Sequence, residues 1–129
     1  MRLLLDTHLL IWFVGRSKRL PPKLLMHISS SKNVVFYSTV SLAEIALKRE
    51  GGRRSEPEIP SNRIHELARA AGLELLESKA AHAAASEGLA VSHGDPFDRL
   101  LLAQAQAEGL QLATHDEALA QYDSRTIVF

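Results

Sequence analysis

Four carboxylates occupy positions in the sequence where they could act together on one substrate. They are Asp6, Glu44, Asp98 and Asp116. Asp6 directly follows an apolar run and Asp116 closely follows another, whereas the other two fall near the starts of expected helices. If the apolar runs are parallel strands, all four acids lie beyond the carboxyl ends of those strands, where ligands bind in such sheets.

Several carboxylates packed closely together cannot all remain ionised without help. A divalent cation would relieve the repulsion, and oxygen-only ligands suit Mg²⁺ or Mn²⁺. Such an ion can lower the pKa of a bound water molecule and neutralise charge on a phosphodiester during in-line attack. The sequence has no cysteine and no His-x₃-His pairing, so it predicts neither thiolate nor zinc chemistry.

The segment around Asp98 has both a structural and a chemical interpretation. Asp95 is a good N-cap, and a helix that starts after it would run to about Glu108 and end at Gly109. Asp98 would then be the third helical residue, where it could form a capping pair with Asp95. It also begins a stripe with core-facing spacing, which continues through Leu101, Leu102 and Ala105. An acid on such a stripe needs a partner, because desolvating an unpaired charge is expensive.

Glu44 presents the same choice. Ser41 precedes it by three residues, which is the spacing of a capping box, and a helix from Ser41 to about Glu50 follows. On that helix the acid shares a face with apolar residues, and the members of the face are Val40, Ala43, Glu44 and Leu47. Asp116 could likewise cap a helix that extends through Gln121.

Composition limits the classes of protein to consider. The chain has 129 residues, 46% of them hydrophobic, which predicts one domain spanning residues 1–129. Fifteen basic and fifteen acidic residues cancel, so the net charge gives no sign of nucleic-acid binding. A local basic patch could still attract a polyanion, although a solvated loop would also explain it; its members are Lys48, Arg49, Arg53 and Arg54. Since no apolar run has the length of a membrane span and the N-terminus is unlike a signal peptide, we expect a cytoplasmic protein.

Short apolar runs alternate with helical segments along the chain. Strands are expected at residues 2–5, 34–37, 73–76, 110–113 and 126–129. Helices are expected at residues 7–14, 22–30, 41–50, 61–71, 79–87, 96–108 and 117–121. This alternation predicts an α/β fold, a three-layer α/β/α sandwich with a parallel sheet and right-handed crossovers. The first helix, with Trp12 and Phe13, is apolar nearly all round, so it lies either in the core or against another chain.

The acidic segments, in this order, resemble the PIN-domain ribonucleases, and specifically the toxins of VapBC-type toxin–antitoxin pairs. The resemblance covers nearly the whole chain. It rests on Leu4-Leu5-Asp6-Thr7-His8, on Ser41-Leu42-Ala43-Glu44-Ile45-Ala46-Leu47-Lys48, on His93-Gly94-Asp95-Pro96-Phe97-Asp98-Arg99 with the following residues 100–105, and on Thr114-His115-Asp116. Each acid alone is a weak signal, whereas the four at these separations are specific.

The resemblance implies roles for individual residues. The family's catalytic acids match Asp6, Glu44, Asp98 and Asp116, of which the first, third and fourth would be metal ligands for one or two Mg²⁺ or Mn²⁺ ions. Thr114 matches the family's Ser or Thr that would hold a carboxylate or a metal-bound water. We assign Asp95 to helix capping and support of the site. For His8, His93 and His115 we expect surface or packing roles.

The resemblance also implies an activity and partners. The activity is endonucleolytic cleavage of RNA that leaves a 5′ phosphate and a 3′ hydroxyl, and the family's substrates are structured RNAs such as transfer RNA. The partners are a second copy of the chain, in a homodimer, and a neutralising antitoxin encoded alongside, whose tail covers the acidic groove.

Three alternative functions use similar residues. A phospho-acceptor signalling domain would need an acceptor Asp after a middle strand and a Lys after a late one, and the sequence has neither at those places. A Mg²⁺-dependent phosphatase of the Asp-x-Asp type would need a second Asp where His8 stands. A PIN-like domain that binds RNA or protein without cutting would have no need of all four acids.

Overall fold

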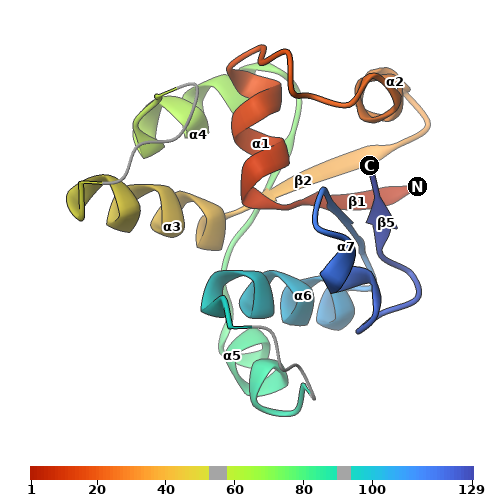
Figure 1. The fold of residues 1–129 in the computed structure, drawn as a ribbon. Coiled ribbons are helices and arrows are strands. Elements are labelled where there is room, and N and C mark those ends of the chain that lie inside the picture. Colours follow the sequence, from red (N-terminus) through yellow and green to blue (C-terminus); the bar gives the residue numbers. More distant parts are fainter. Residues whose placement is uncertain (53–57, 90–93) are drawn as a thin grey trace.

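The computed structural model describes residues 1–52, 58–89 and 94–129, and in these residues five strands form one parallel sheet (Figure 1). The strands are β1 (Arg2–Leu5), β2 (Val34–Ser38), β3 (Glu74–Leu76), β4 (Gln111–Thr114) and β5 (Ile127–Val128). Their order across the sheet is β3-β2-β1-β4-β5, so β1 lies at the centre. The predicted parallel α/β fold is therefore confirmed.

Helices cover both faces of the sheet and complete three layers (Figure 1). The described helices are α1 (Thr7–Val14), α2 (Pro22–Ser29), α3 (Thr39–Glu50), α4 (Ser61–Ala70), α5 (Ala80–Glu87), α6 (Pro96–Glu108) and α7 (Glu117–Ala120). Helices α1, α2 and α4 lie on one side of the sheet, whereas α6 and α7 lie on the other. Helix α3 extends from the end of β2 and contacts both α4 and α6, and α5 packs against α6. No helix in the described ranges is long and apolar enough to span a bilayer.

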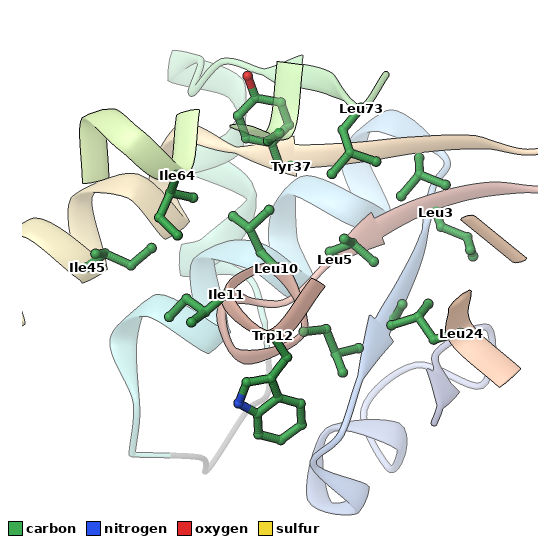
Figure 2. Packing of buried hydrophobic residues seen from close by; sticks show 14 residues of the cluster. Leu3, Leu5, Leu10, Ile11, Trp12, Leu24, Tyr37, Ile45, Ile64 and Leu73 are labelled. Atoms are coloured by element: carbon green, nitrogen blue, oxygen red, sulfur yellow. The ribbon is translucent and has the colours of Figure 1, made fainter. Parts of the chain in front are cut away.

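The central strand supplies both halves of the core, because successive side chains of a strand point to opposite faces. Leu3 and Leu5 pack beneath α1, in a cluster that includes Leu10 and Tyr37 (Figure 2). Leu4 points the other way and packs with Leu101 and its neighbours on α6. These strand residues are fully buried, which fixes the register of β1 and hence the position of the residue that follows it.

The register brings two predicted site residues side by side at the carboxyl edge of the sheet. Leu5 is paired with Ala113 of β4, and the backbone N–H of Asp6 donates to the carbonyl of Ala113 (2.9 Å). Asp6 and Thr114 therefore lie side by side at the carboxyl ends of β1 and β4. In a parallel sheet this edge is also where α3 begins after β2 and where α6 begins before its return to β4 (Figure 1).

Helix α6 has the predicted limits and ends. The side chain of Asp95 accepts a hydrogen bond from the N–H of Phe97 (2.9 Å), as an N-cap does. At the other end Gly109 has φ +66°, a left-handed conformation that glycine adopts without strain. Of the predicted core stripe, the three apolar members, residues 101, 102 and 105, are fully buried, while Asp98 is half-buried at the first turn.

The prediction for the start of α3 is wrong. The helix begins at Thr39, and Ser38 is the N-cap, whose hydroxyl accepts from the N–H of Val40 (2.9 Å). Ser41 and Glu44 therefore form no capping box; both are buried inside the helix. The predicted apolar face is also wrong in part, because Ala43 and Leu47 are exposed, and the covered face comprises Val40, Ser41, Glu44 and Ile45.

Candidate metal site at the carboxyl edge of the sheet

Asp6 and Glu44 are the two fully buried members of the four acids at this edge, and Asp6 follows the central strand. Asp6 is 3% exposed and serves as the N-cap of α1, because its Oδ1 accepts from the N–H of Leu9 (2.9 Å). Its Oδ2 accepts from the hydroxyl of Thr114 (2.5 Å) and from the N–H of His115 (3.3 Å). Burial raises the pKa of the Asp6 carboxyl, and the hydrogen bonds from Thr114 and the two N–H groups oppose this rise.

The hydroxyl of Thr114 connects Asp6 with the segment that carries Asp116. While its proton goes to Asp6, its oxygen accepts from the N–H of Asp116 (3.0 Å). The side chain of Asp116 is half-buried, and its Oδ1 accepts from the N–H of Ala118 (2.9 Å), which caps the short α7. The capping interpretation of Asp116 thus holds, and it fixes this carboxylate beside the end of β4.

We expect Thr114→Val to lower the free energy of unfolding by about 1 to 3 kcal/mol, because it leaves the buried Oδ2 of Asp6 and the N–H of Asp116 each short of a partner. Urea denaturation monitored by circular dichroism measures this. Thr126→Val is a matched control, since the hydroxyl of Thr126 is buried without a hydrogen-bond partner in the described structure. Equal losses in the two variants would contradict the connecting role of Thr114.

Glu44 lies on α3, is 2% exposed, and has a partner at each oxygen. Its Oε1 accepts from the hydroxyl of Thr7 (2.6 Å), and its Oε2 forms an ion pair with the ammonium of Lys48 (2.5 Å). The hydroxyl of Ser41 lies 3.0 Å from that of Thr7. Thr7 directly follows Asp6, so Glu44 is held beside the same end of β1.

The sequence prediction did not assign a role to Thr7 or identify the contact of Ser41. The signal for Thr7 was its place between a buried strand and a helix, directly after Asp6. The signal for Ser41 was present but ambiguous, because a serine three residues before a glutamate fits both a capping box and a buried polar face.

Asp98 approaches this edge from a third element, the first turn of α6. Among the described residues no group of three or more His, Cys, Asp or Glu side chains is close enough to hold a metal ion between them. The structure thus connects Asp6, Asp116 and Glu44 through two threonine hydroxyls, whereas it does not gather Asp98 and the other acids into one compact ligand set.

The donor set nevertheless fits a magnesium-like ion. Mg²⁺ in proteins is usually bound by one or two carboxylates and keeps several waters, so it requires no cluster of three side chains. Asp6 is a buried carboxylate whose hydrogen-bond donors are all neutral. A cation at its oxygens would offset the cost of its burial.

The predicted basic patch is only partly described. Lys48 pairs with Glu44, and Arg49 pairs with Glu58 (3.3 Å). Arg53 and Arg54 lie outside the described residues, as does His93.

The apolar helix α1 contributes its tryptophan to the core. Trp12 is 8% exposed, and its ring contacts those of His8 and His115, with centroid separations of 5.9 and 5.2 Å. The Nδ1 of His115 also lies 2.7 Å from the main-chain oxygen of Phe129. Phe13 is half-buried and lines a cleft of about 730 Å³ between α1, α2 and α4.

Comparison with known proteins gives one family and a consistent set of structures. The family model of the PIN domain matches residues 3–124. The structure of VapBC2 from Rickettsia felis bound to a promoter DNA fragment contains a chain with 17% identity and a TM-score of 0.70, and the match covers 100% of this chain and 98% of that one. A chain of DNA-bound VapBC from Salmonella typhimurium has 16% identity and a TM-score of 0.69. A chain of VapBC-1 from nontypeable Haemophilus influenzae has 17% identity and a TM-score of 0.66. Each of these two matches covers 100% of this chain and 97% of the other. No match was found among curated proteins.

Proposed function

Because this chain belongs to the PIN-domain family, we propose that it is a divalent-metal-dependent endoribonuclease and the toxin of a toxin–antitoxin pair. The observation that carries the nuclease assignment is the burial of Asp6, a carboxylate with only neutral hydrogen-bond donors at the end of the central strand. Two further acids are attached to the same edge through Thr7 and Thr114. Such an arrangement costs stability in the absence of a cation and therefore favours a role in binding one.

In this proposal Asp6, Asp98 and Asp116 hold one or two Mg²⁺ or Mn²⁺ ions, which supply an activated water and neutralise charge on the RNA phosphodiester. The protein's own part is positioning. Thr114 keeps one oxygen of Asp6 in place and fixes the backbone at Asp116. Asp95 caps α6 and thereby fixes the first turn, on which Asp98 stands.

Incubation of the purified chain with bacterial transfer RNA tests the activity. We expect fragments with a 5′ phosphate and a 3′ hydroxyl in Mg²⁺ or Mn²⁺ and intact RNA in EDTA. Cleavage of equal extent in EDTA, or 2′,3′-cyclic phosphate ends, would contradict the metal-dependent mechanism.

A bound ion should also stabilise the folded chain, because the unfolded chain lacks the assembled site. At a free Mn²⁺ concentration of about one hundred times Kd, the gain should be about 2.7 kcal/mol, or a Tm increase of roughly 10 °C for a chain of this size. Differential scanning calorimetry measures it, with Asp6→Asn as the variant in which the increase should be lost. The same increase in both proteins would place the ion elsewhere.

An antitoxin is the proposed protein partner, since the similar structures are those of toxin–antitoxin complexes. The cleft lined by Phe13, Val14, Leu20 and Leu67 gives a partner segment an apolar surface whose rim carries Arg16 and Lys18. Co-expression with the adjacent upstream reading frame should yield a co-purifying complex. Light scattering of the isolated chain tests the proposed homodimer.

RNA is the proposed substrate, although the chain carries no net charge. We propose that Lys48, Arg49, Arg53 and Arg54 supply the local attraction for its phosphates. Lys48 forms an ion pair with Glu44, one of the four acids.

A further inference from the structure

Glu44 differs from Asp6 in the partners it already has. Both of its oxygens are occupied within the chain, one by the hydroxyl of Thr7 and the other by the ammonium of Lys48. Asp6, in contrast, receives hydrogen bonds only from neutral N–H and O–H groups in the described structure. Among the described residues, the hydrogen-bond donors to Asp6 are therefore neutral groups, whereas Glu44 accepts from a cationic one.

The ion pair of Glu44 is not an ordinary surface pair. Exposed pairs at this helical spacing contribute little to stability, but the glutamate side chain here is only 3% exposed, against 35% for the lysine. A partner charge offsets part of the cost of burying such a carboxylate. A metal ion at Glu44 would lie beside the Lys48 ammonium and be repelled by it.

Lys48 is held near the end of β1 through its ion pair with Glu44. The carboxylate of Glu44 contacts the Lys48 ammonium with one oxygen and the hydroxyl of Thr7 with the other. Thr7 directly follows Asp6 in the chain. An ammonium has three N–H donors, and the contact with Glu44 uses one of them. Because a third of the side chain remains exposed, the other donors can reach an anion from solvent.

We propose that Lys48 positions an RNA phosphate at this site, and that Glu44 serves to hold its ammonium there and is not itself a direct metal ligand. This assignment rests on the proposed nuclease function. Under this assignment Asp6 would hold the metal ion, whereas Glu44 holds the ammonium of Lys48.

The variants for the test must avoid leaving a buried charge without its partner. Glu44→Gln keeps an oxygen for the hydroxyl of Thr7 and removes the charge. The double variant Glu44→Gln/Lys48→Met then removes the ammonium in a background where no buried carboxylate is left unpaired. Lys48→Arg keeps the positive charge, and Lys32→Met, in the exposed turn before β2, is the matched control for loss of one lysine.

The first measurement is Mn²⁺ binding without RNA, by electron paramagnetic resonance. We expect Glu44→Gln to bind Mn²⁺ within about threefold of the wild-type affinity, whereas loss of a direct ligand weakens metal binding by tenfold or more, since even supporting residues have effects of about 10- to 100-fold. A loss of that size in Glu44→Gln would overturn the proposal.

The second measurement is binding of a fluorescein-labelled RNA hairpin in EDTA at several salt concentrations. Relative to Glu44→Gln, the double variant should bind about tenfold more weakly, with a salt slope smaller by about one. Lys48→Arg should retain the wild-type slope, and Lys32→Met should retain wild-type binding. If the double variant and Glu44→Gln bind alike, Lys48 is only a structural counter-ion and the proposal is wrong.

The two measurements separate failure of this inference from failure of the proposed function. A wild-type chain that binds neither Mn²⁺ nor the hairpin contradicts the nuclease assignment and this inference together. A wild-type chain that binds both, with variants that deviate from the results above, contradicts the roles of Glu44 and Lys48 alone.

Discussion

Asp6→Asn is expected to lose RNA cleavage by at least about a hundredfold while making the metal-free protein more stable. Asparagine is nearly isosteric and is itself a good N-cap, so its Oδ1 can still accept from the N–H of Leu9. The change removes the negative charge of a side chain that is 3% exposed and that accepts hydrogen bonds from neutral groups of Leu9, Thr114 and His115. We expect the free energy of unfolding to increase by about 1 kcal/mol in EDTA. The increase is limited because the substitution removes the acceptor at Oδ2.

The pH dependence should have a definite sign. Since burial raises the pKa of Asp6 above its ordinary value of 3.8, the folded chain binds this proton more tightly than the unfolded chain does. The contribution of Asp6 to stability is therefore most favourable below pH 3.8 and decreases as the pH rises from there through the raised pKa. Urea denaturation in EDTA across this range should show the decrease in the wild type and a smaller one in Asp6→Asn.

Asp123→Asn is the matched control for Asp6→Asn. The carboxylate of Asp123 pairs with the guanidinium of Arg125 (3.2 Å) and accepts from the backbone N–H of the same residue, so the same chemical change should lower stability there and leave cleavage unchanged. Wild-type cleavage by Asp6→Asn would remove Asp6 from the site. Destabilisation of both variants by the same amount would mean that Asp6 serves chiefly as a helix cap.

Lys48→Met is expected to destabilise the chain by about 2 kcal/mol, which is less than for a fully buried pair because the lysine is partly exposed. The loss arises at Glu44, which remains buried with one hydrogen bond from Thr7 and no counter-charge. Adding Glu44→Gln should restore most of the stability, because the double variant buries no unpaired charge. A double-mutant cycle by urea denaturation measures the coupling.

The alternative for Lys48 is a helix-surface pair with no buried component. In that case each single variant would change stability by less than about 0.5 kcal/mol, and the two changes would be additive. Small, additive effects would contradict the claim that Glu44 needs the Lys48 ammonium because it is buried.

The fold could be predicted from the sequence because its signals are local. Asp95, Pro96 and Gly109 mark both ends of α6 through the backbone conformations they prefer. The apolar runs mark the strands, and their alternation with helices leaves few topologies other than a parallel sheet. That topology alone predicts which ends of the strands, and hence which acids, share an edge.

The contacts within the site could not be predicted in the same way, because they join residues far apart in the chain. The hydrogen bond from Thr114 to Asp6 spans 108 residues, and that from Thr7 to Glu44 spans 37. The N-cap of α3 was misassigned for a related reason. Ser38 and Ser41 are both suitable caps; in the structure Ser38 caps the helix, and Ser41 is buried with its hydroxyl against that of Thr7.

The measurement that tests the metal site most directly is anomalous X-ray scattering from crystals of the chain grown with Mn²⁺. We expect an anomalous peak at the carboxyl edge of the sheet, within coordination distance of an oxygen of Asp6 and of Asp98 or Asp116. Saturated crystals in which that edge has no peak, or in which the only peak lies at another surface, would contradict the site.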